Sequence, residues 1–382
     1  MIDNSLTIIL TLRGRHLHTL RWMWHANRTS LPYHIIIADG EVHPTIDRLL
    51  SDPSIFPNIS YEYHRYRDLS LTDYYKKIKE TIAKVATTYT MCSDNDDFVM
   101  STGIQKSINY LKNYPEYVCA GGKIPNFSLS QNKQLPNYVI GEISSIGFGY
   151  KNQHRDISNC LPSERVLQEI DYYQPVWYHV FRTNDLRLII QEIEEINFSD
   201  ASIVEFYHAL RAVTLGKVHT DSSAICYLRQ AGTSTNSHLS NDWVYYLLRS
   251  KLPEDFRAIA KVIAENVEIN DINILADFKE TILDKYASYL RHMLGHTMMR
   301  YRFPRLFKIK HQLIWIRKIQ YTPKWLQHRL IERNLKKEVL KNCQDATMIL
   351  LLKNEFQEIK ETLQGDDYVR FLKAYANDLL IH

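Results

Sequence analysis

The sequence predicts an α/β fold with a mostly parallel sheet and helices on both faces, followed by an all-helical C-terminal domain. Two observations lead to this prediction. The first ~120 residues alternate short apolar strands with helix-spaced segments, and this order builds parallel sheets because each return strand needs a crossover. After residue 241 the apolar residues recur three and four apart, without strand signals. We therefore expect an α/β domain over residues 1–241 and a helical domain over residues 242–382.

The N-terminal elements are indicated by their apolar patterns. Short runs of branched aliphatic and aromatic residues predict strands, whereas apolar residues three and four apart predict helices. The expected strands are 6–12, 33–39, 60–66 and 88–94, and the expected helices are 16–27 and 71–85. In parallel sheets, ligands sit beyond the carboxyl ends of the strands. The residues that end these strands are therefore the first candidates for a functional site.

The second half of the α/β domain has a weaker pattern. Gly, Pro, Asn and Ser punctuate residues 120–175, which predicts long loops over a site. A strand is expected at 176–183, a helix at 199–217, and a final strand within 218–230. The helix begins near Asp200 and ends at Gly216, in agreement with the usual helix start and stop signals.

Composition places the chain among ordinary globular proteins. It has 382 residues, of which 45% are hydrophobic and 24% charged. Its five cysteines are scattered without a CxxC pair, which argues against a disulfide framework or a structural zinc site and favours a reducing compartment. The apolar run 6–12 is only seven residues long, far below the ~20 residues of a spanning helix. We expect a cytoplasmic protein without a signal peptide.

Charge is distributed unevenly along the chain. Residues 300–337 contain twelve Lys or Arg and one acid, so this basic segment carries a net +11 and the remainder carries −7. The basic residues are interleaved with aromatic and aliphatic ones. Three interpretations stay open: contact with an anionic membrane surface at the inner face or with a glycolipid, a solvated helical face, and, least favoured, nucleic-acid binding.

The segment "CSDNDDF" (92–98) crowds three carboxylates at the end of an expected strand. Such groups repel one another and are costly to desolvate, so a positive charge should accompany them. The alternative is a solvated acidic loop that caps the next helix. Asp39 ends the second expected strand just as Asp94 ends the fourth. This coincidence favours a cation site over a simple cap.

Two segments carry a resemblance to a known family. The stretch "TIILTLRGRHLHTLRWMWHANRTSLPYHIIIADGE" looks like the start of a GT-A glycosyltransferase of the large inverting glycosyltransferase family 2, whose pattern is "PTYNR…SLL…IIVVDDGS". The stretch "SDNDDFVMSTGIQKSINYL" resembles that family's "DADDxxxPxxLxxxxxxL". The match covers roughly residues 5–230 and is closest to a bacterial surface-polysaccharide branch with a DNDDF or ADDDF motif. It implies a GT-A fold, a nucleotide-sugar donor and a divalent cation, Mn²⁺ or Mg²⁺.

The resemblance also implies roles for individual residues. Asp94 would contact the ribose or a metal-bound water, and Asp96 would ligate the metal, while Asp97 would be a ligand or a helix cap. Asp39 would hold the nucleobase or ribose. Thr11 and Arg15 would line the base pocket, although "TLRG" stands here in place of the family's "PTYN". Carboxylate oxygens suit these hard cations, and a D-x-D in extended chain turns both carboxylates to one side.

The remaining implied roles lie in the second half of the chain. An inverting transferase needs a general base that deprotonates the acceptor hydroxyl. Asp200 is the favoured candidate, with an N-cap role as its alternative; the pair Glu194 and Glu195 is a second choice. Arg229 would grip the diphosphate, and His238 is a further candidate metal ligand.

The sequence therefore predicts a metal-dependent glycosyltransferase that moves a sugar from a nucleotide donor to a bacterial glycan or lipid-linked acceptor. Two alternatives remain: a non-catalytic scaffold on a degenerate transferase fold, and a sugar nucleotidyltransferase. The latter needs a Gly-rich phosphate loop, and "TLRGRH" supplies one Gly only. The sequence contains no GxSxG, Walker A or GxGxxG motif, so hydrolase, ATPase and dinucleotide chemistry are not indicated.

Overall fold

The computed structural model describes residues 3–43, 46–130, 139–148, 155–231, 251–267, 269, 272–284, 324–341, 343 and 345–379. A seven-stranded sheet forms its centre, in the order β10-β6-β9-β4-β1-β2-β3. Its strands are β1 (Asp3–Leu12), β2 (Tyr33–Asp39), β3 (Tyr61–Arg65), β4 (Tyr89–Asp94), β6 (Tyr117–Lys123), β9 (Val180–Arg182) and β10 (Lys217–Ile225). All neighbouring strands are parallel except β9, which is antiparallel to β4 and β6.

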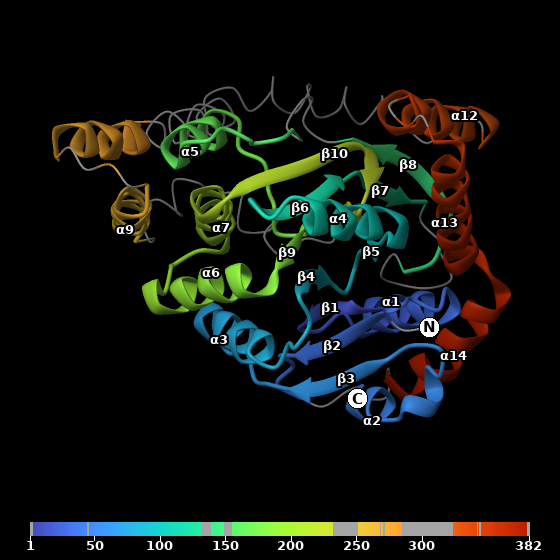
Figure 1. The fold of residues 1–382 in the computed structure, drawn as a ribbon. Helices are drawn as coiled ribbons and strands as arrows, with labels where there is room; N and C mark the ends of the chain where they lie inside the picture. The colour runs from blue at the N-terminus through green and yellow to red at the C-terminus, as the bar shows by residue number, and fades with distance from the viewer. Residues whose placement is uncertain are drawn as a thin grey trace, which may run out of the picture.

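Helices cover both faces of this sheet (Figure 1). One layer contains α3 (Leu71–Ile82), α6 (Thr183–Ile196) and α7 (Ala201–Leu215), with α5 (Pro162–Asp171) packed on α7. The other contains α1 (His16–Arg28) and α4 (Ser101–Asn113), with α13 (Ala346–Gln364) in contact with both and α14 (Asp366–Leu379) in contact with α1. The short α2 (Asp47–Leu50) and a 3-10 turn (Pro53–Ile55) lead into β3. The predicted α/β class is therefore confirmed.

The central strands form because both of their faces are buried. In β1, Leu6, Ile8, Ile9 and Leu10 are each 0% exposed, as expected for a parallel strand between two helical layers. Helix α3 begins with a capping box between Ser70 and Asp73, which satisfies amide groups of the first turn. The register aligns the carboxyl ends of β1, β2 and β4, because Thr11 lies opposite Asp94 and Leu12 lies opposite Asp39.

The expectation of long loops over residues 120–175 is wrong in part. This stretch contributes β7 (Asn126–Leu129), β8 (Ile143–Gly147) and α5. Together with β5 (Phe98–Val99) and β11 (Tyr227–Gln230), β7 and β8 make a second sheet in the order β5-β11-β7-β8. These strands are short, and their pairing partners lie far apart in sequence. A local pattern therefore does not reveal them.

Two further expectations need correction. The single strand expected within 218–230 is split: β10 ends after a register shift, and β11 continues in the second sheet. The strand expected at 176–183 is reduced to β9, and a helix that was not expected, α6, begins at Thr183. Residues 176–179 form a turn in which the backbone amide of His179 donates to the carbonyl of Val176 at 2.9 Å. The aromatic pattern there reflects burial beside a cavity rather than pairing in a sheet.

The described residues after 251 are helical, as predicted. They include α9 (Leu252–Glu265), a helical segment over 272–284, α12 (Lys324–Leu335), a π-helical turn (Lys336–Leu340), α13 and α14. Helix α9 packs on α7, whereas α13 and α14 pack on α1. The expected boundary between residues 241 and 242 lies outside the described residues. Among the described helices, none is long and apolar enough to cross a membrane.

Candidate functional site

A cavity of about 380 Å³ opens at the carboxyl ends of β1 and β4. Residues from the β1–α1 loop, the β4–α4 loop, the start of α3, the turn before β9, the start of α7 and β11 line it. It thus lies where ligands bind in parallel α/β sheets. The cavity brings together the predicted residues Thr11, Arg15, Asp94, Asp96 and Arg229.

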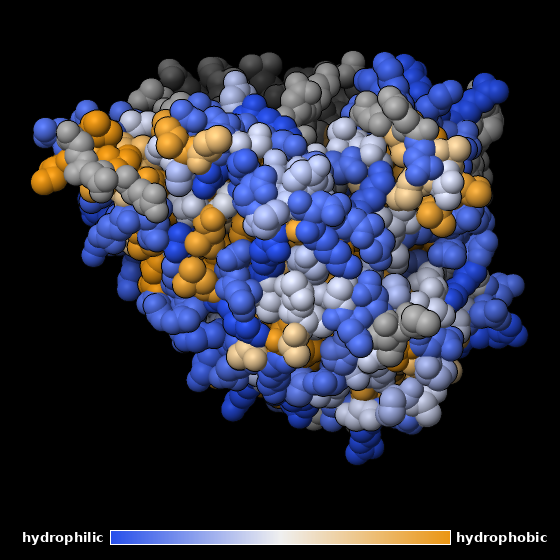
Figure 2. Space-filling view, viewed as in Figure 1, coloured by the Kyte–Doolittle hydropathy of each residue, from blue (hydrophilic) through white to orange (hydrophobic). Residues whose placement is uncertain are grey.

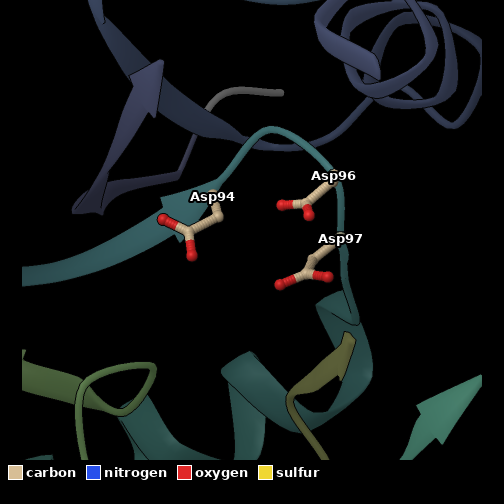
Figure 3. A group of neighbouring side chains, drawn as sticks. All are labelled: Asp94, Asp96 and Asp97. Carbon is tan, nitrogen blue, oxygen red and sulfur yellow. The ribbon is translucent and has the colours of Figure 1, made fainter. Parts of the chain in front are cut away.

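Three carboxylates form the acidic side of this cavity. Asp94 ends β4, while Asp96 and Asp97 follow in the loop, and one oxygen of each lies within 4.8 Å of the others. In Figure 3, the side chains of Asp96 and Asp97 point from the loop toward Asp94, at the end of β4. Asp96 and Asp97 are only 5% and 3% exposed. The "CSDNDDF" segment is therefore a folded, largely buried cluster and not a solvated acidic loop.

Asp94 is held by hydroxyl groups. Its Oδ1 accepts a hydrogen bond from the Thr11 hydroxyl at 3.2 Å, and its Oδ2 accepts one from the Tyr178 hydroxyl at 2.6 Å. The amide of Asp94 donates to the Tyr227 hydroxyl at 2.8 Å, and the rings of Tyr178 and Tyr227 stack at 4.1 Å. Burial raises the pKa of Asp94, as does the neighbouring Asp96 carboxylate, while Tyr178 and Arg229 oppose the rise.

Asp96 is held by two arginines. The Arg15 guanidinium donates to Asp96 Oδ2 at 2.5 Å, and Arg15 adopts a left-handed backbone with φ of 55°, an uncommon conformation outside glycine. Arg21 is fully buried and donates to the backbone carbonyl of Asp96 at 2.5 Å. Between the aspartates, the side-chain amide of Asn95 donates to the Thr19 hydroxyl at 2.9 Å and to the Gly14 carbonyl at 3.2 Å. These contacts fix the acidic loop against α1.

Asp97 faces β11. Its Oδ1 accepts the amide of Gln230 at 2.7 Å. Burial raises the pKa of Asp97 well above its usual value, and the charges of Asp96 and Asp94 raise it further. The Arg229 guanidinium lowers the pKa of Asp97, but it offsets the rise only in part. This guanidinium lies 5.4 Å from the Tyr178 ring centre.

These observations meet the requirements of a divalent cation site. The donors are hard carboxylate oxygens, they converge within 4.8 Å, and they border an open cavity. Mg²⁺ and Mn²⁺ prefer such ligands and commonly take one or two carboxylates with substrate phosphates. Burial raises the pKa of Asp94 and of Asp97, and the neighbouring carboxylates raise both further, so ionising the cluster costs free energy that Arg229 offsets only in part. A bound cation would offset more of this cost.

This cost has a consequence for stability. Because the pKa of Asp97 is higher in the folded protein than the usual 3.8, the folded state binds more protons than the unfolded state above that pH. Metal-free protein should therefore lose stability as pH rises from 5 to 8, and excess Mn²⁺ should restore it. Thermal denaturation in EDTA and in Mn²⁺ across this range measures the effect.

The control for this prediction replaces a carboxylate outside the cluster. Asp97→Asn should reduce the pH dependence in EDTA, since Asp94 and Glu205 still contribute to it, whereas Asp284→Asn, at an exposed position, should leave it unchanged. Equal pH dependence in all three proteins would contradict the origin in the acidic cluster.

Asp39 lies beside the cavity but does not line it. The side chain is 3% exposed, and its carboxylate accepts hydrogen bonds from the Tyr63 hydroxyl at 2.7 Å and the Glu41 amide at 2.8 Å. It therefore organises the end of β2, and its predicted contact with a base or ribose remains a prediction. His238 lies outside the described residues.

The predicted general base, Asp200, sits directly before α7 at the edge of the cavity. Its neighbour Ala201 lines the cavity, and so does Glu205 one helical turn later. Glu194 pairs with Lys79 at 2.9 Å, and Glu195 accepts from Gln191, so both belong to the outer side of α6.

Glu205 is the carboxylate of α7 that faces the cavity. The Glu205 side chain is exposed at the cavity opening; the protein around its carboxylate still displaces water, and this raises its pKa to about 7. Arg229 lowers this value in part, while Asp94 and Asp200 raise it. A carboxylate with a pKa near neutrality is suited to general base catalysis.

Sequence reasoning missed several residues of the site. Glu205 lies four residues after Ala201. On the helix predicted at 199–217, this spacing places Glu205 on the same face as Ala201. Tyr178, Arg21 and Asn95 carry no comparable signal, because their roles depend on contacts between segments far apart in the chain.

Fold and cavity together define an α/β protein with an acidic, cation-suited pocket at the carboxyl edge of its parallel sheet. No protein-family model matches the sequence, and no curated protein matches it. Among solved structures, S. aureus TarS 1-349 is 12% identical, with a TM-score of 0.49 over 94% of this chain and 90% of that one. The same protein in complex with UDP-GlcNAc is 11% identical with a TM-score of 0.48, again over 94% and 90%. At these TM-scores the likeness assigns no activity to this chain.

Proposed function

We propose that the chain is a metal-dependent GT-A glycosyltransferase that moves a sugar from a nucleotide-sugar donor to a glycan or lipid-linked acceptor, with inversion at the transferred carbon. One observation supports this most: three converging carboxylates and a separate near-neutral carboxylate, Glu205, border the same cavity. The first group suits a cation and the second suits proton abstraction.

Asp96 and Asp94 would hold the cation, with Asp97 as a further ligand or as the anchor of the loop through Gln230. A bound Mn²⁺ or Mg²⁺ supplies Lewis-acid stabilisation of the diphosphate leaving group. Arg229 and Arg15 line the cavity and would add positive charge beside the phosphates. Thr11, at the end of β1, would lie under the donor.

Glu205 would accept the proton of the acceptor hydroxyl while the hydroxyl oxygen attacks the sugar carbon. The acceptor proton passes to a Glu205 Oε, the new glycosidic bond forms, and the bond to the diphosphate breaks. Asp200 would act on Glu205 through its charge, since it raises the pKa of that group. This assigns the proton transfer to Glu205 in place of the base predicted from sequence.

The cysteines agree with a cytoplasmic enzyme. Cys92, Cys119, Cys160, Cys226 and Cys343 are all free, as is usual in a reducing compartment.

Turnover of a donor panel tests the proposal. UDP-, GDP- and CDP-sugars would be incubated with the protein in Mn²⁺, Mg²⁺ or EDTA, and the release of nucleoside diphosphate would be measured. We expect release from one nucleotide class, only with metal, and its loss in Asp96→Asn. Pyrophosphate release from a nucleoside triphosphate and a sugar phosphate would instead identify a nucleotidyltransferase. Binding without turnover of any donor would favour a scaffold.

A further inference from the structure

A second surface, far from the cavity in sequence, combines positive charge with exposed leucines. It is formed by α12, the π-helical turn and the first half of α13, and we call it the basic leucine surface. Five cations line a groove here, with Leu340 and Ile349 between them. The cations are Arg333, Lys336, Lys337, Lys341 and Lys353. Figure 2 shows hydrophobic side chains among hydrophilic ones over α12 and α13.

The charges of this surface are poorly balanced. Within the described part of the chain, Lys337 pairs with Glu338 at 3.8 Å, whereas the other four cations form no ion pair with an acid there. Arg333, Lys336, Lys337 and Lys341 follow one another at steps of three, one and four residues, which places them along one side of the helix and its π-turn. Like charges held this close repel, and an anionic partner would relieve the repulsion.

Leucines are exposed on the same elements. Leu330 is 42% exposed on α12, and Leu350 and Leu351 are 59% and 44% exposed at the start of α13. Leu350 lies three residues before Lys353, so the two are neighbours on the helix surface. Leu330 and Leu350, each three residues before a cation of the groove, fit a surface that enters a headgroup layer, with the aliphatic groups in its apolar part. A soluble polyanion offers no apolar region in which these leucines could be buried.

The surface is rigidly attached to the rest of the protein. The Lys123 ammonium donates to the backbone carbonyl of Glu338 at 2.7 Å, and the side-chain amide of Asn334 donates to the backbone carbonyl of Ile146 at 3.2 Å. Val339, in the π-turn, is 0% exposed and packs in the cluster under the second sheet. The cations are therefore presented by a fixed scaffold, so little order has to be gained on binding.

We propose that the basic leucine surface binds an anionic lipid bilayer and holds the protein against it. Part of the basic segment predicted at 300–337 belongs to this surface, while residues 300–323 lie outside the described part. The structure adds Lys341, Lys353 and the exposed leucines of α13, which the charge count of that segment did not include. The proposal does not depend on the proposed transferase activity.

Vesicle co-sedimentation of the full chain tests the proposal. The vesicles would be phosphatidylcholine alone or with about a third phosphatidylglycerol. Each cation near an anionic membrane contributes roughly a factor of five to binding, so reversing Lys336, Lys337 and Lys341 to Glu should weaken binding to the anionic vesicles by about 100-fold or more. A control with Lys112, Lys251 and Lys261, exposed elsewhere, reversed to Glu should bind as the wild type does.

A second variant separates a membrane from a soluble polyanion. Leu350→Ser with Leu351→Ser should also weaken vesicle binding by about tenfold, without changing retention on heparin. Circular dichroism and thermal unfolding would show that all variants are folded. Absent binding of the wild type to anionic vesicles, or equal losses in the surface and control triples, would overturn the proposal. Equal vesicle binding by the leucine variant and the wild type would show that the leucines do not enter the bilayer and would contradict the apolar part of the proposal.

Discussion

Replacing Glu205 with Gln is expected to lower kcat by about 10²–10⁴-fold, the usual contribution of a general base. The substitution keeps the size of the side chain and removes its ability to accept a proton. Because Glu205 lines the cavity from α7 while the metal ligands come from the β4 loop, nucleotide affinity in the presence of Mn²⁺ should change little. A loss in kcat with an unchanged donor Kd is therefore the expected signature.

The pH profile separates catalysis from structure. Since the pKa of Glu205 is about 7, wild-type kcat should rise as pH increases through 7 and then level off, as the carboxylate becomes ionised. Glu205→Gln should lack this rise. Asp200→Asn should keep the rise but move it to lower pH, because the Asp200 charge raises the pKa of Glu205. Glu194→Gln, at the outer side of α6, should behave as the wild type.

These variants also choose between the two candidate bases. A loss of about 10²-fold or more in Asp200→Asn, combined with near-normal kcat in Glu205→Gln, would assign proton transfer to Asp200, as sequence reasoning predicted, and contradict the assignment made from the cavity.

Arg21→Met is expected to destabilise the protein by about 2–5 kcal/mol. The Arg21 guanidinium is fully buried and donates to the Gln230 side chain at 2.6 Å and to the Asp96 carbonyl at 2.5 Å. Methionine fills much of the same volume but leaves both acceptors without donors, and each unsatisfied acceptor costs about 1–3 kcal/mol. Relief of the guanidinium's own desolvation offsets part of this cost.

The same substitution should remove the cation site. Arg21 joins α1 to the acidic loop and to β11, and its positive charge lies near Asp96 and Asp97. Without it, the loop that carries the carboxylates loses a hydrogen bond to α1, and α1 loses its hydrogen bond to Gln230 of β11. We expect Arg21→Met to lose stabilisation by Mn²⁺ and nucleotide even at temperatures where it remains folded.

Arg28→Met is the matched control on the same helix. Arg28 pairs with Glu361 at the surface, where its side chain is 36% exposed, so its replacement should cost at most about 1 kcal/mol. Urea denaturation of the two variants measures the difference. Equal free energies of unfolding for both would show that Arg21 does not support the loop.

The sequence predicted the parts of this protein that depend on local patterns. Apolar runs predict β1, β2 and β4, and alternation predicts β3, while the acidic loop is indicated by its position after β4. Thr11, Arg15 and Arg229, which the resemblance marks as site residues, line the cavity, and their roles there stay predictions. In each case the information lies within a few residues, or in the rule that parallel strands end at a common edge.

Long-range pairing explains what the sequence did not reveal. In the second sheet β5 pairs with β11, which brings Val99 beside Tyr227, 128 residues further along the chain (227 − 99), and no short window contains that relation. Arg21 reads as one polar residue of an amphipathic helix, yet it is buried under the acidic loop. Asp200 has the typical position of a helix start, so the sequence favours it over Glu205, and only the folded cavity shows that Glu205 lines it.

Thermal unfolding with nucleotides tests the central claim, that the acidic loop holds a divalent cation beneath a nucleotide diphosphate. The wild type, Asp96→Asn and the control Asp284→Asn would be heated with UDP, GDP or CDP, each with Mn²⁺ or EDTA. A ligand at about a hundred times its Kd adds roughly 2.7 kcal/mol of stability. We predict that one nucleotide stabilises the wild type and the control only with Mn²⁺, and does not stabilise Asp96→Asn. Stabilisation that is equal in Mn²⁺ and EDTA, or that survives in Asp96→Asn, would contradict the claim.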